Sequence, residues 1–298
     1  MAYIVPNSVF KTKSGRNIRS ILSPYLTQVY DYTTTNVFEN VLTSPTIIII
    51  DRATQSPNIT YSDLSRGNRT EVIRASLRDE WLFGDAQQGV DGSHRFGDYF
   101  KVATGVATQY NKAFILSGWT DDGEYIVKND MRVEKSIVRK AASPRGKAYQ
   151  TSEFIIFPYY YSDGRVMHYS EAELKGKYPF AYQYLEKKKS ELEARDSDKN
   201  ANWFEFGRSQ ALTHINQNKL LLSTVITGKV HVYELEETEV PYSGLFIVAK
   251  DRPDPLSLLV AQEILTSDAF FQYIEPRGIS ASGKSVRITA KIIEDYRW

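Results

Sequence analysis

The chain has 298 residues, 42% of them hydrophobic and 24% charged, and these values exclude a disordered or fibrous protein. Its 37 basic and 36 acidic residues give a formal net charge of +1, so no whole-molecule field indicates a polyanionic partner. It has no cysteine, which excludes disulfides, thiolate nucleophiles and cysteine-bound zinc.

The longest aliphatic run, residues 47–50, is too short to span a bilayer, and the first residues lack the pattern of a secretory signal. These features predict a soluble, cytoplasmic protein, and the length suggests roughly two domains. The 20 tyrosines favour a binding surface, although a tyrosine-rich core is the alternative interpretation.

The first 52 residues combine strand and helix patterns. Strands are predicted at 2–5, 26–32 and 46–51, and a short helix at 15–23. The unbroken aliphatic run in the third strand favours burial on both faces, as in the middle of an α/β sheet. Because these elements are too few to form a domain, we expect them to be the closing edge of a larger sheet.

Residues 53–95 are polar and rich in Ser, Asp, Gly, Asn and Arg, which predicts a linker with one short helix. From residue 96 onward, short strands are predicted at 102–106, 113–116, 126–127, 154–157, 220–227, 229–233, 245–250 and 285–293, and amphipathic helices at 179–194 and 256–274. The sequence therefore predicts a mixed α+β fold.

Familiar catalytic motifs are absent or incomplete. The four histidines show no metal-binding spacing, and no Gly-x-Ser-x-Gly elbow of an α/β-hydrolase occurs. A metal-dependent nuclease of the Pro-Asp…Glu-x-Lys kind needs two carboxylates and a lysine around the ion. Pro253-Asp254 has no such partner after it, and Glu173-Leu-Lys175 has no Pro-Asp before it. The sequence therefore predicts no metal site.

One segment, Gly278-Ile-Ser-Ala-Ser-Gly-Lys-Ser285, matches the P-loop expression letter for letter. A P-loop joins a buried strand to a helix whose N-terminus faces the phosphates. Here the preceding residues have a helical pattern and the following ones alternate like a strand. We therefore expect this loop to contact nucleic-acid phosphates rather than to bind a nucleotide.

Local charge is more informative than the total. Residues 131–149 hold six basic residues and one acidic residue, and residues 277–291 hold four basic residues and no acidic one. Such loops suit phosphate binding, and arginine can also donate to guanine. The alternative is a solvated face whose charge is balanced elsewhere. Two basic clusters together with aromatic segments such as Tyr159-Tyr160-Tyr161 favour nucleic-acid binding.

Several segments from residue 96 onward resemble a known module in their order. They are the run from Phe96-Gly-Asp-Tyr-Phe to Phe114, Ile155-Ile-Phe-Pro-Tyr159, Tyr178-Pro-Phe-Ala-Tyr-Gln-Tyr-Leu185, Trp203-Phe-Glu-Phe-Gly-Arg208, Tyr242-Ser-Gly-Leu-Phe-Ile-Val248 and Gly283-Lys-Ser-Val-Arg-Ile288. Together they resemble the TaqI-like C-terminal specificity domain. That domain is the target recognition domain of gamma-class adenine-N6 DNA methyltransferases and of fused restriction-modification enzymes.

The N-terminal segments Tyr3-Ile-Val-Pro-Asn-Ser-Val-Phe10 and Ser44-Pro-Thr-Ile-Ile-Ile-Ile50 resemble the last strands of the methyltransferase domain in the same enzymes. The resemblance therefore implies three regions. Residues 1–52 would be the C-terminal edge of a methyltransferase-like α/β sheet, residues 53–95 a linker, and residues 96–298 the DNA target recognition domain.

The catalytic motifs of this family have no match. The Asn/Asp/Ser-Pro-Pro-aromatic loop is absent, because Ser23-Pro-Tyr25 lacks the second proline, and the glycine-rich loop for S-adenosylmethionine is absent too. We therefore expect no catalytic residue and no cofactor in this chain. A separate methyltransferase catalytic chain would hold S-adenosylmethionine and pair with residues 47–50, expected to be a sheet edge.

These arguments imply a specificity module for double-stranded DNA in an adenine-specific restriction-modification system. The residues expected to contact DNA are Lys112, Arg139, Lys140, Arg145, Lys147, Arg165, Arg208, Lys284 and Arg287. Two alternatives stay open. One is an enzyme, a DNA-acting nuclease or modified-base hydrolase, and the other is a non-catalytic protein-interaction remnant.

Overall fold

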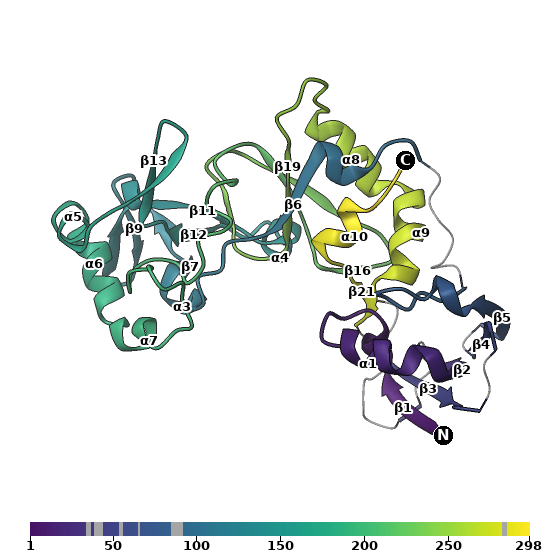
Figure 1. Cartoon of the computed structure of the whole chain (residues 1–298). Coiled ribbons are helices and arrows are strands. Elements are labelled where there is room, and N and C mark those ends of the chain that lie inside the picture. Colours follow the sequence, from purple (N-terminus) through teal and green to yellow (C-terminus); the bar gives the residue numbers. More distant parts are fainter. Residues whose placement is uncertain (34–36, 39–43, 54–55, 65, 85–91, 282–284) are drawn as a thin grey trace. The chain divides into compact units, whose positions relative to one another are not determined.

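The computed structural model describes residues 1–33, 37–38, 44–53, 56–64, 66–84, 92–281 and 285–298. Helices and strands alternate along these residues, and the strands form several separate sheets (Figure 1), so the fold is mixed α+β as predicted. The chain divides into two compact units. Unit 1 contains Met1–Asp98, Thr224–Val230 and Glu263–Trp298, and unit 2 contains Tyr99–Ser223 and His231–Gln262.

Unit 1 begins with a five-stranded sheet of order β1-β3-β2-β4-β5. Its strands are β1 (Ala2–Pro6), β2 (Leu26–Asp31), β3 (Pro45–Ile50), β4 (Asn58–Asp63) and β5 (Asn68–Ile73), with the helical segments η1 (Asn7–Phe10), α1 (Arg16–Leu22), η2 (Ser23–Tyr25) and η3 (Arg74–Ser76). Val29 of β2 and Ile48 of β3 are buried in one core cluster with Phe10 and Trp81. The three strands and the helix predicted for the first 52 residues are therefore confirmed.

Two expectations for this sheet are wrong. Residues 47–50 are not a sheet edge, because β3 lies between β1 and β2 and pairs with both. The segment 53–95 is more than a linker with one short helix, because it provides β4 and β5. In β5, an edge strand, only Val72 is buried, so its sequence lacks the apolar alternation by which a strand is recognised.

The rest of unit 1 comes from later in the chain. Its elements are β16 (Val225–Thr227), α9 (Asp268–Arg277), β20 (Ile279–Ser280), β21 (Ser285–Arg287) and α10 (Ala290–Glu294). Lys11 joins this part to the N-terminal residues, because its Nζ donates to the carbonyl oxygens of Pro276 at 2.8 Å and Gly278 at 2.7 Å. Burial lowers the pKa of Lys11 to about 8.

Two elements near the C-terminus differ from the prediction. The helix expected at 256–274 is two helices, α8 (Leu258–Thr266) and α9, because the Ser267 side chain accepts a hydrogen bond from the Phe270 N–H and begins a new helix. The strand expected at 285–293 ends with β21. Thr289 then caps α10 by accepting from the Ile292 N–H.

Unit 2 contains two four-stranded sheets, of order β18-β11-β12-β7 and β17-β15-β19-β6, a three-stranded sheet β10-β9-β8 and the two-stranded ribbon β13-β14. The strands are β6 (Phe100–Thr104), β7 (Ile115–Ser117), β8 (Thr120–Asp121), β9 (Tyr125–Lys128), β10 (Met131–Glu134), β11 (Val138–Ala142), β12 (Glu153–Ile156), β13 (Tyr159–Ser162), β14 (Arg165–His168), β15 (Lys219–Leu222), β17 (Val232–Leu235), β18 (Val240–Pro241) and β19 (Leu245–Ala249).

The helices between residues 96 and 193 are short. They are α2 (Phe96–Tyr99), α3 (Asn111–Phe114), α4 (Pro144–Ala148), α5 (Glu171–Lys177), α6 (Pro179–Glu186) and α7 (Lys189–Glu193), with the 3-10 turn η5 (Lys135–Ile137). The helix expected at 179–194 is therefore interrupted between α6 and α7. The strand expected at 113–116 begins as α3 and becomes β7 only at Ile115.

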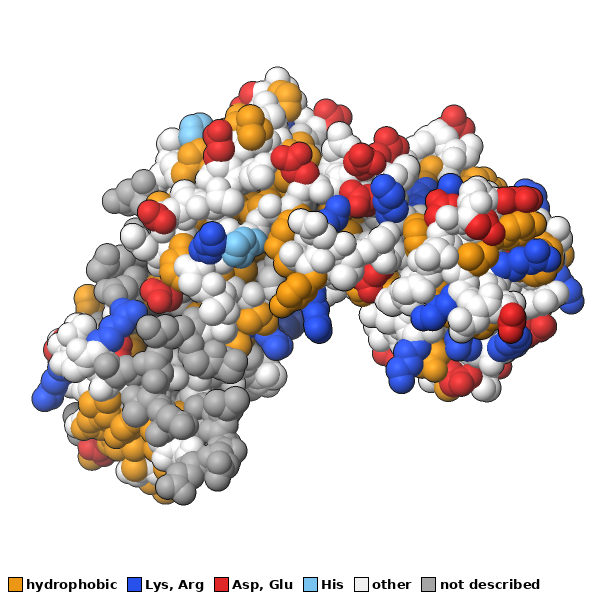
Figure 2. Space-filling view, turned by 180° about the vertical axis from the view of Figure 1, so that it is seen from behind, with side chains coloured by type: hydrophobic (Ala, Val, Ile, Leu, Met, Phe, Trp, Pro, Cys, Tyr) orange, Lys and Arg blue, Asp and Glu red, His pale blue; other side chains and the backbone are white. Residues whose placement is uncertain are grey.

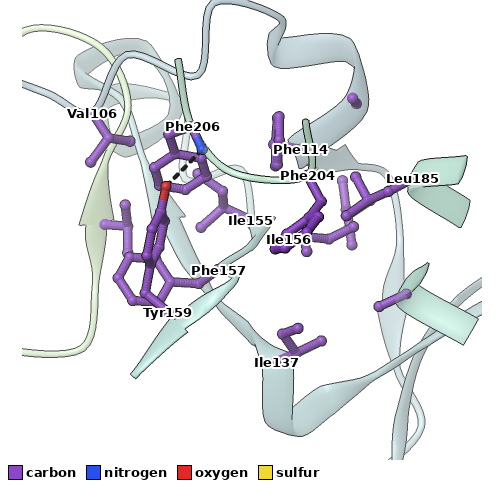
Figure 3. Close-up of a cluster of buried hydrophobic side chains, with 14 of the residues drawn as sticks. Val106, Phe114, Ile137, Ile155, Ile156, Phe157, Tyr159, Leu185, Phe204 and Phe206 are labelled. Atoms are coloured by element: carbon purple, nitrogen blue, oxygen red, sulfur yellow. Dashed lines mark hydrogen bonds between the residues drawn. The ribbon is translucent and has the colours of Figure 1, made fainter. Parts of the chain in front are cut away.

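Aromatic side chains form much of the core of unit 2 (Figure 3). The rings of Phe114 and Phe206 lie 5.2 Å apart, and those of Phe157 and Phe206 lie 5.9 Å apart. Tyr159 is also buried, and its hydroxyl accepts a hydrogen bond from the Phe206 N–H at 2.7 Å. Several tyrosines thus belong to the core, while Tyr149 and Tyr160 are exposed.

Candidate nucleic-acid interface

The two-stranded ribbon β13-β14 projects from the neighbouring strands of unit 2 (labelled β13 in Figure 1). Its two strands are joined by Asp163 (φ 49°) and Gly164 (φ 73°), and a positive φ at both residues is typical of a type I′ hairpin turn. Arg165 follows the turn and is exposed. Tyr160 pairs with Met167, and both side chains are 38% exposed.

The opposite side of the ribbon is fixed to the core. Tyr161 donates from its hydroxyl to the carbonyl oxygen of Leu212 at 2.6 Å, and Nδ1 of His168 lies 2.8 Å from Oε1 of Glu205. The Glu205 side chain is 2% exposed, whereas that of His168 is 51% exposed. The ribbon is therefore held at its base by hydrogen bonds and presents its other face, with Tyr160 and Met167, to solvent.

Arg139 lies at the base of the ribbon. Its guanidinium carbon is 4.0 Å from the centroid of the Phe157 ring and 5.2 Å from that of Tyr161, and Nη1 donates to Oδ1 of Asn216 at 3.3 Å. Among the described residues it forms no ion pair. Burial lowers the pKa of Arg139 from its ordinary value, but an arginine guanidinium stays charged at neutral pH.

A hollow of about 250 Å³ adjoins this guanidinium. It is lined by side chains that include Ser136, Arg139, Tyr160, Tyr169 and Asn216. Tyr160 and Tyr169 contact each other, with ring centroids 4.9 Å apart. The hollow thus combines one cation with the exposed ring of Tyr160, and cations and aromatic rings are groups that nucleic-acid bases bind.

Lys140 follows Arg139 in β11, so their side chains point to opposite faces of the strand. Lys140 lines a separate groove of about 610 Å³ together with Lys147 and Lys219. Lys147 Nζ forms an ion pair with Glu239 Oε1 at 2.7 Å. Burial lowers the pKa of Lys219 to about 8, and its Nζ donates to the carbonyl oxygens of Glu236 and Glu237. The basic segment 131–149 therefore does not act as one patch.

The other candidate residues differ in how far they are free to bind DNA. Lys112, Arg145 and Arg165 are exposed and form no ion pair with described residues. Arg208 is engaged, because Nη2 lies 2.6 Å from Asp196 Oδ2 and Nη1 lies 3.5 Å from Asp198 Oδ1.

The second basic cluster lies in unit 1. Arg287 is an exposed residue of β21, and Lys284 lies outside the described residues. Lys291 lies 3.7 Å from Glu80, and the guanidinium of Arg277 stacks on Tyr273 at 4.2 Å. Over the face drawn in Figure 2, lysine and arginine side chains are interspersed with aspartate and glutamate. The distribution of charged side chains on this face therefore does not by itself locate a DNA-binding surface.

Sequence reasoning did not identify Asn216, Tyr169 or Glu205. The hydrogen bond from Arg139 to Asn216 spans 77 positions of sequence, and no spacing rule predicts such a pair. The Tyr159-Tyr160-Tyr161 run was the available signal for the ribbon. Within the described part of the chain, no group of three or more His, Asp or Glu side chains could hold a metal ion, and no helix is long and apolar enough to cross a membrane.

Comparison with known proteins places this chain beside restriction-modification enzymes. No family model matches it. The Type II restriction enzyme and methyltransferase RM.Eco57I of Escherichia coli is 22% identical over 317 residues, which cover 90% of this chain and 31% of that protein. The chain thus spans less than a third of that relative and is homologous to part of a restriction enzyme and methyltransferase.

Solved structures add a similarity of fold. The Type IIL restriction-modification enzyme MmeI, solved in complex with DNA, matches with a TM-score of 0.56 and 13% identity, covering 99% of this chain and 38% of that one. The type IIG restriction endonuclease BpuSI matches with a TM-score of 0.37 and 10% identity over 99% of this chain and 39% of its own.

Proposed function

We propose that this chain is the DNA-specificity module of an adenine-specific restriction-modification enzyme, with a TaqI-like target recognition domain. The observation that carries the proposal is the ribbon β13-β14, which presents Arg165 at its exposed tip, while Tyr160 lines a hollow with Arg139, whose guanidinium forms no ion pair among the described residues. A two-stranded ribbon is narrow enough to enter the major groove of B-DNA, where base edges are distinguishable. The relation to RM.Eco57I supports a role in restriction and modification.

In this proposal the contacts have two roles. Exposed Lys112, Arg145 and Arg287 would bind phosphates and position the duplex, and Arg165 at the ribbon tip would read a base edge. Lys140 would contribute from the groove of about 610 Å³. Lys147 and Arg208 already have acidic partners, so each would have to exchange a carboxylate for a phosphate.

In this proposal, the residues that catalyse methyl transfer are not in this chain. The chain lacks the Pro-Pro-aromatic loop and the glycine-rich S-adenosylmethionine loop of the family that it resembles. We place that chemistry in a separate catalytic chain. Ile4, Ile18, Ile21 and Ile73 of unit 1 are 44–66% exposed, and such apolar side chains are suited to a protein partner. The purified chain alone should transfer no methyl group to adenine, and transfer by it would contradict this assignment.

The specificity role is tested by selecting bound duplexes from a random-sequence pool and measuring their affinity at several salt concentrations. We expect duplexes with one particular sequence to stay bound at a salt concentration that abolishes non-specific binding. Arg165→Ala should relax the preference at one position by about 1–3 kcal/mol. Arg69→Ala, an exposed arginine in the edge strand β5, is the matched control. Equal affinity for all sequences would contradict the proposal.

A further inference from the structure

We infer that the hollow beside Arg139 holds a single guanine base that lies outside the duplex stack. The inference rests on the proposed function and deepens it, because it assigns a ligand to one site of the interface. The hollow has a volume of about 250 Å³ and is lined by Arg139, Tyr160, Tyr169 and Asn216, among other residues. Pockets for drug-sized ligands have about 300–1,000 Å³, so this one suits a single ring system.

The guanidinium of Arg139 favours a ligand with hydrogen-bond acceptors. Three tyrosine hydroxyls are already engaged: Tyr159 with the Phe206 N–H, Tyr161 with the Leu212 carbonyl, and Tyr169 with the Tyr178 hydroxyl at 3.1 Å. The guanidinium of Arg139 carries five N–H donors, and among the described residues Asn216 is its one hydrogen-bond acceptor. A ligand with two adjacent acceptors would satisfy this guanidinium.

The shape of the site decides how DNA can present those acceptors. Arg139 is half-buried in a concave surface, and base edges of an intact duplex lie at the bottom of a groove about 8.5 Å deep. A recessed side chain does not reach them. It can contact only a part of DNA that protrudes, which is either a phosphate or a base turned out of the stack.

An exposed tyrosine ring favours the base over the phosphate. Tyr160 is 38% exposed and lines the hollow, so its ring is accessible for stacking. A base stacks favourably on an aromatic side chain, whereas a phosphate gains nothing from a ring face. Among the bases, guanine presents O6 and N7 as two acceptors on one edge, which matches the arginine fork.

Asn216 acts as the positioning residue for Arg139. Its Oδ1 accepts from Arg139 Nη1, and its Nδ2 donates to Glu237 Oε1 at 2.9 Å. This chain of hydrogen bonds holds the guanidinium over the Phe157 ring. Replacing the amide by a carboxylate in Asn216→Asp would pair Arg139 internally and remove its N–H groups from the ligand.

The test uses fluorescence anisotropy with the full chain and a duplex that carries one unpaired guanine. The same duplex is prepared with 7-deazaguanine, which lacks N7, with adenine at the unpaired position, and with no unpaired base. We expect the guanine duplex to bind about tenfold more tightly than the other three, which corresponds to about 1.4 kcal/mol. Arg139→Lys and Asn216→Asp should both abolish this preference, because the planar fork is lost or occupied.

Arg132→Lys is the matched control. Arg132 lies in the same basic segment, and its guanidinium stacks at 4.0 Å on Phe180 and 5.0 Å on Tyr125, away from the hollow. It should keep the guanine preference.

Three outcomes would overturn the inference. If Arg139→Lys weakens all four duplexes equally, Arg139 binds a phosphate. If the wild-type chain selects a duplex sequence but does not distinguish guanine from 7-deazaguanine, the hollow is not a guanine site and the specificity role stands. If no duplex binds, the proposed function fails as well.

Discussion

Lys219 Nζ donates to the carbonyl oxygen of Glu236 at 2.6 Å, although the Lys219 residue is only 1% exposed. A charged amine is thus held inside unit 2 by backbone dipoles, and desolvation lowers its pKa from 10.5 to about 8. Between these two values the unfolded chain binds more protons than the folded one. The stability contributed by this group therefore rises as the pH increases from about 8 to 10.5.

The change is measured as the difference in unfolding free energy between the wild type and Lys219→Met in urea at pH 7 and pH 10. We expect this difference to shift in favour of the wild type at pH 10, by a value on the order of 1–3 kcal/mol. The exposed neighbour Lys140, replaced by Met, should show no comparable shift. A difference that is independent of pH would mean that the amine is solvated.

Tyr159→Phe should destabilise unit 2 by about 1–3 kcal/mol, because the buried Phe206 N–H loses its acceptor. Tyr160→Phe removes the hydroxyl of the neighbouring exposed residue and should change the free energy of unfolding by less than about 0.5 kcal/mol. Urea titration of both variants measures the difference. Equal effects would show that the Tyr159 hydroxyl is dispensable.

Gly164→Ala should strain the turn of the ribbon, because φ is 73° there, at a cost of about 1–2 kcal/mol. Gly176→Ala, in helix α5, should stabilise the protein by about 0.4–1 kcal/mol, since an added Cβ meets no atom within 4 Å and the backbone is helical. Thermal unfolding of the two variants compares the same Gly→Ala substitution at a residue with positive φ and at a helical residue. A stabilising Gly164→Ala would contradict the turn geometry.

Ion pairing predicts an order among the DNA contacts that we propose. Arg208→Ala should weaken duplex binding less than Lys112→Ala, because Arg208 already has two aspartate partners and Lys112 has none among the described residues. Loss of one phosphate contact should lower the slope of log affinity against log salt by about 0.9. Salt titrations of both variants measure it, and a larger effect of Arg208→Ala would reverse this ranking.

The sequence predicts the buried elements best. The aliphatic run at β3 and the apolar strands β12 and β19 are recognisable because burial requires apolar side chains. The edge strand β5 is not recognisable, because solvent accepts its polar residues. The helix break at Ser267 depends on one capping hydrogen bond, which a periodic apolar pattern conceals.

The candidate site is predictable to a smaller extent. Counting charges in residues 131–149 finds Arg139 and Lys140 but not that they point to opposite faces of β11. Asn216, which orients Arg139, belongs to a distant segment and carries no sequence signal. The assignment of residues 96–298 to a DNA target recognition domain stays a prediction.

The pairing of Lys11 with the end of α9 matters for the design of chimeras between this chain and its relatives. A graft that cuts once near residue 96 would take α9 and α10 away from the lysine that satisfies the Pro276 and Gly278 carbonyls. An exchange that follows the two compact units would instead replace Tyr99–Ser223 and His231–Gln262. All the segments of unit 1 would then come from the recipient protein.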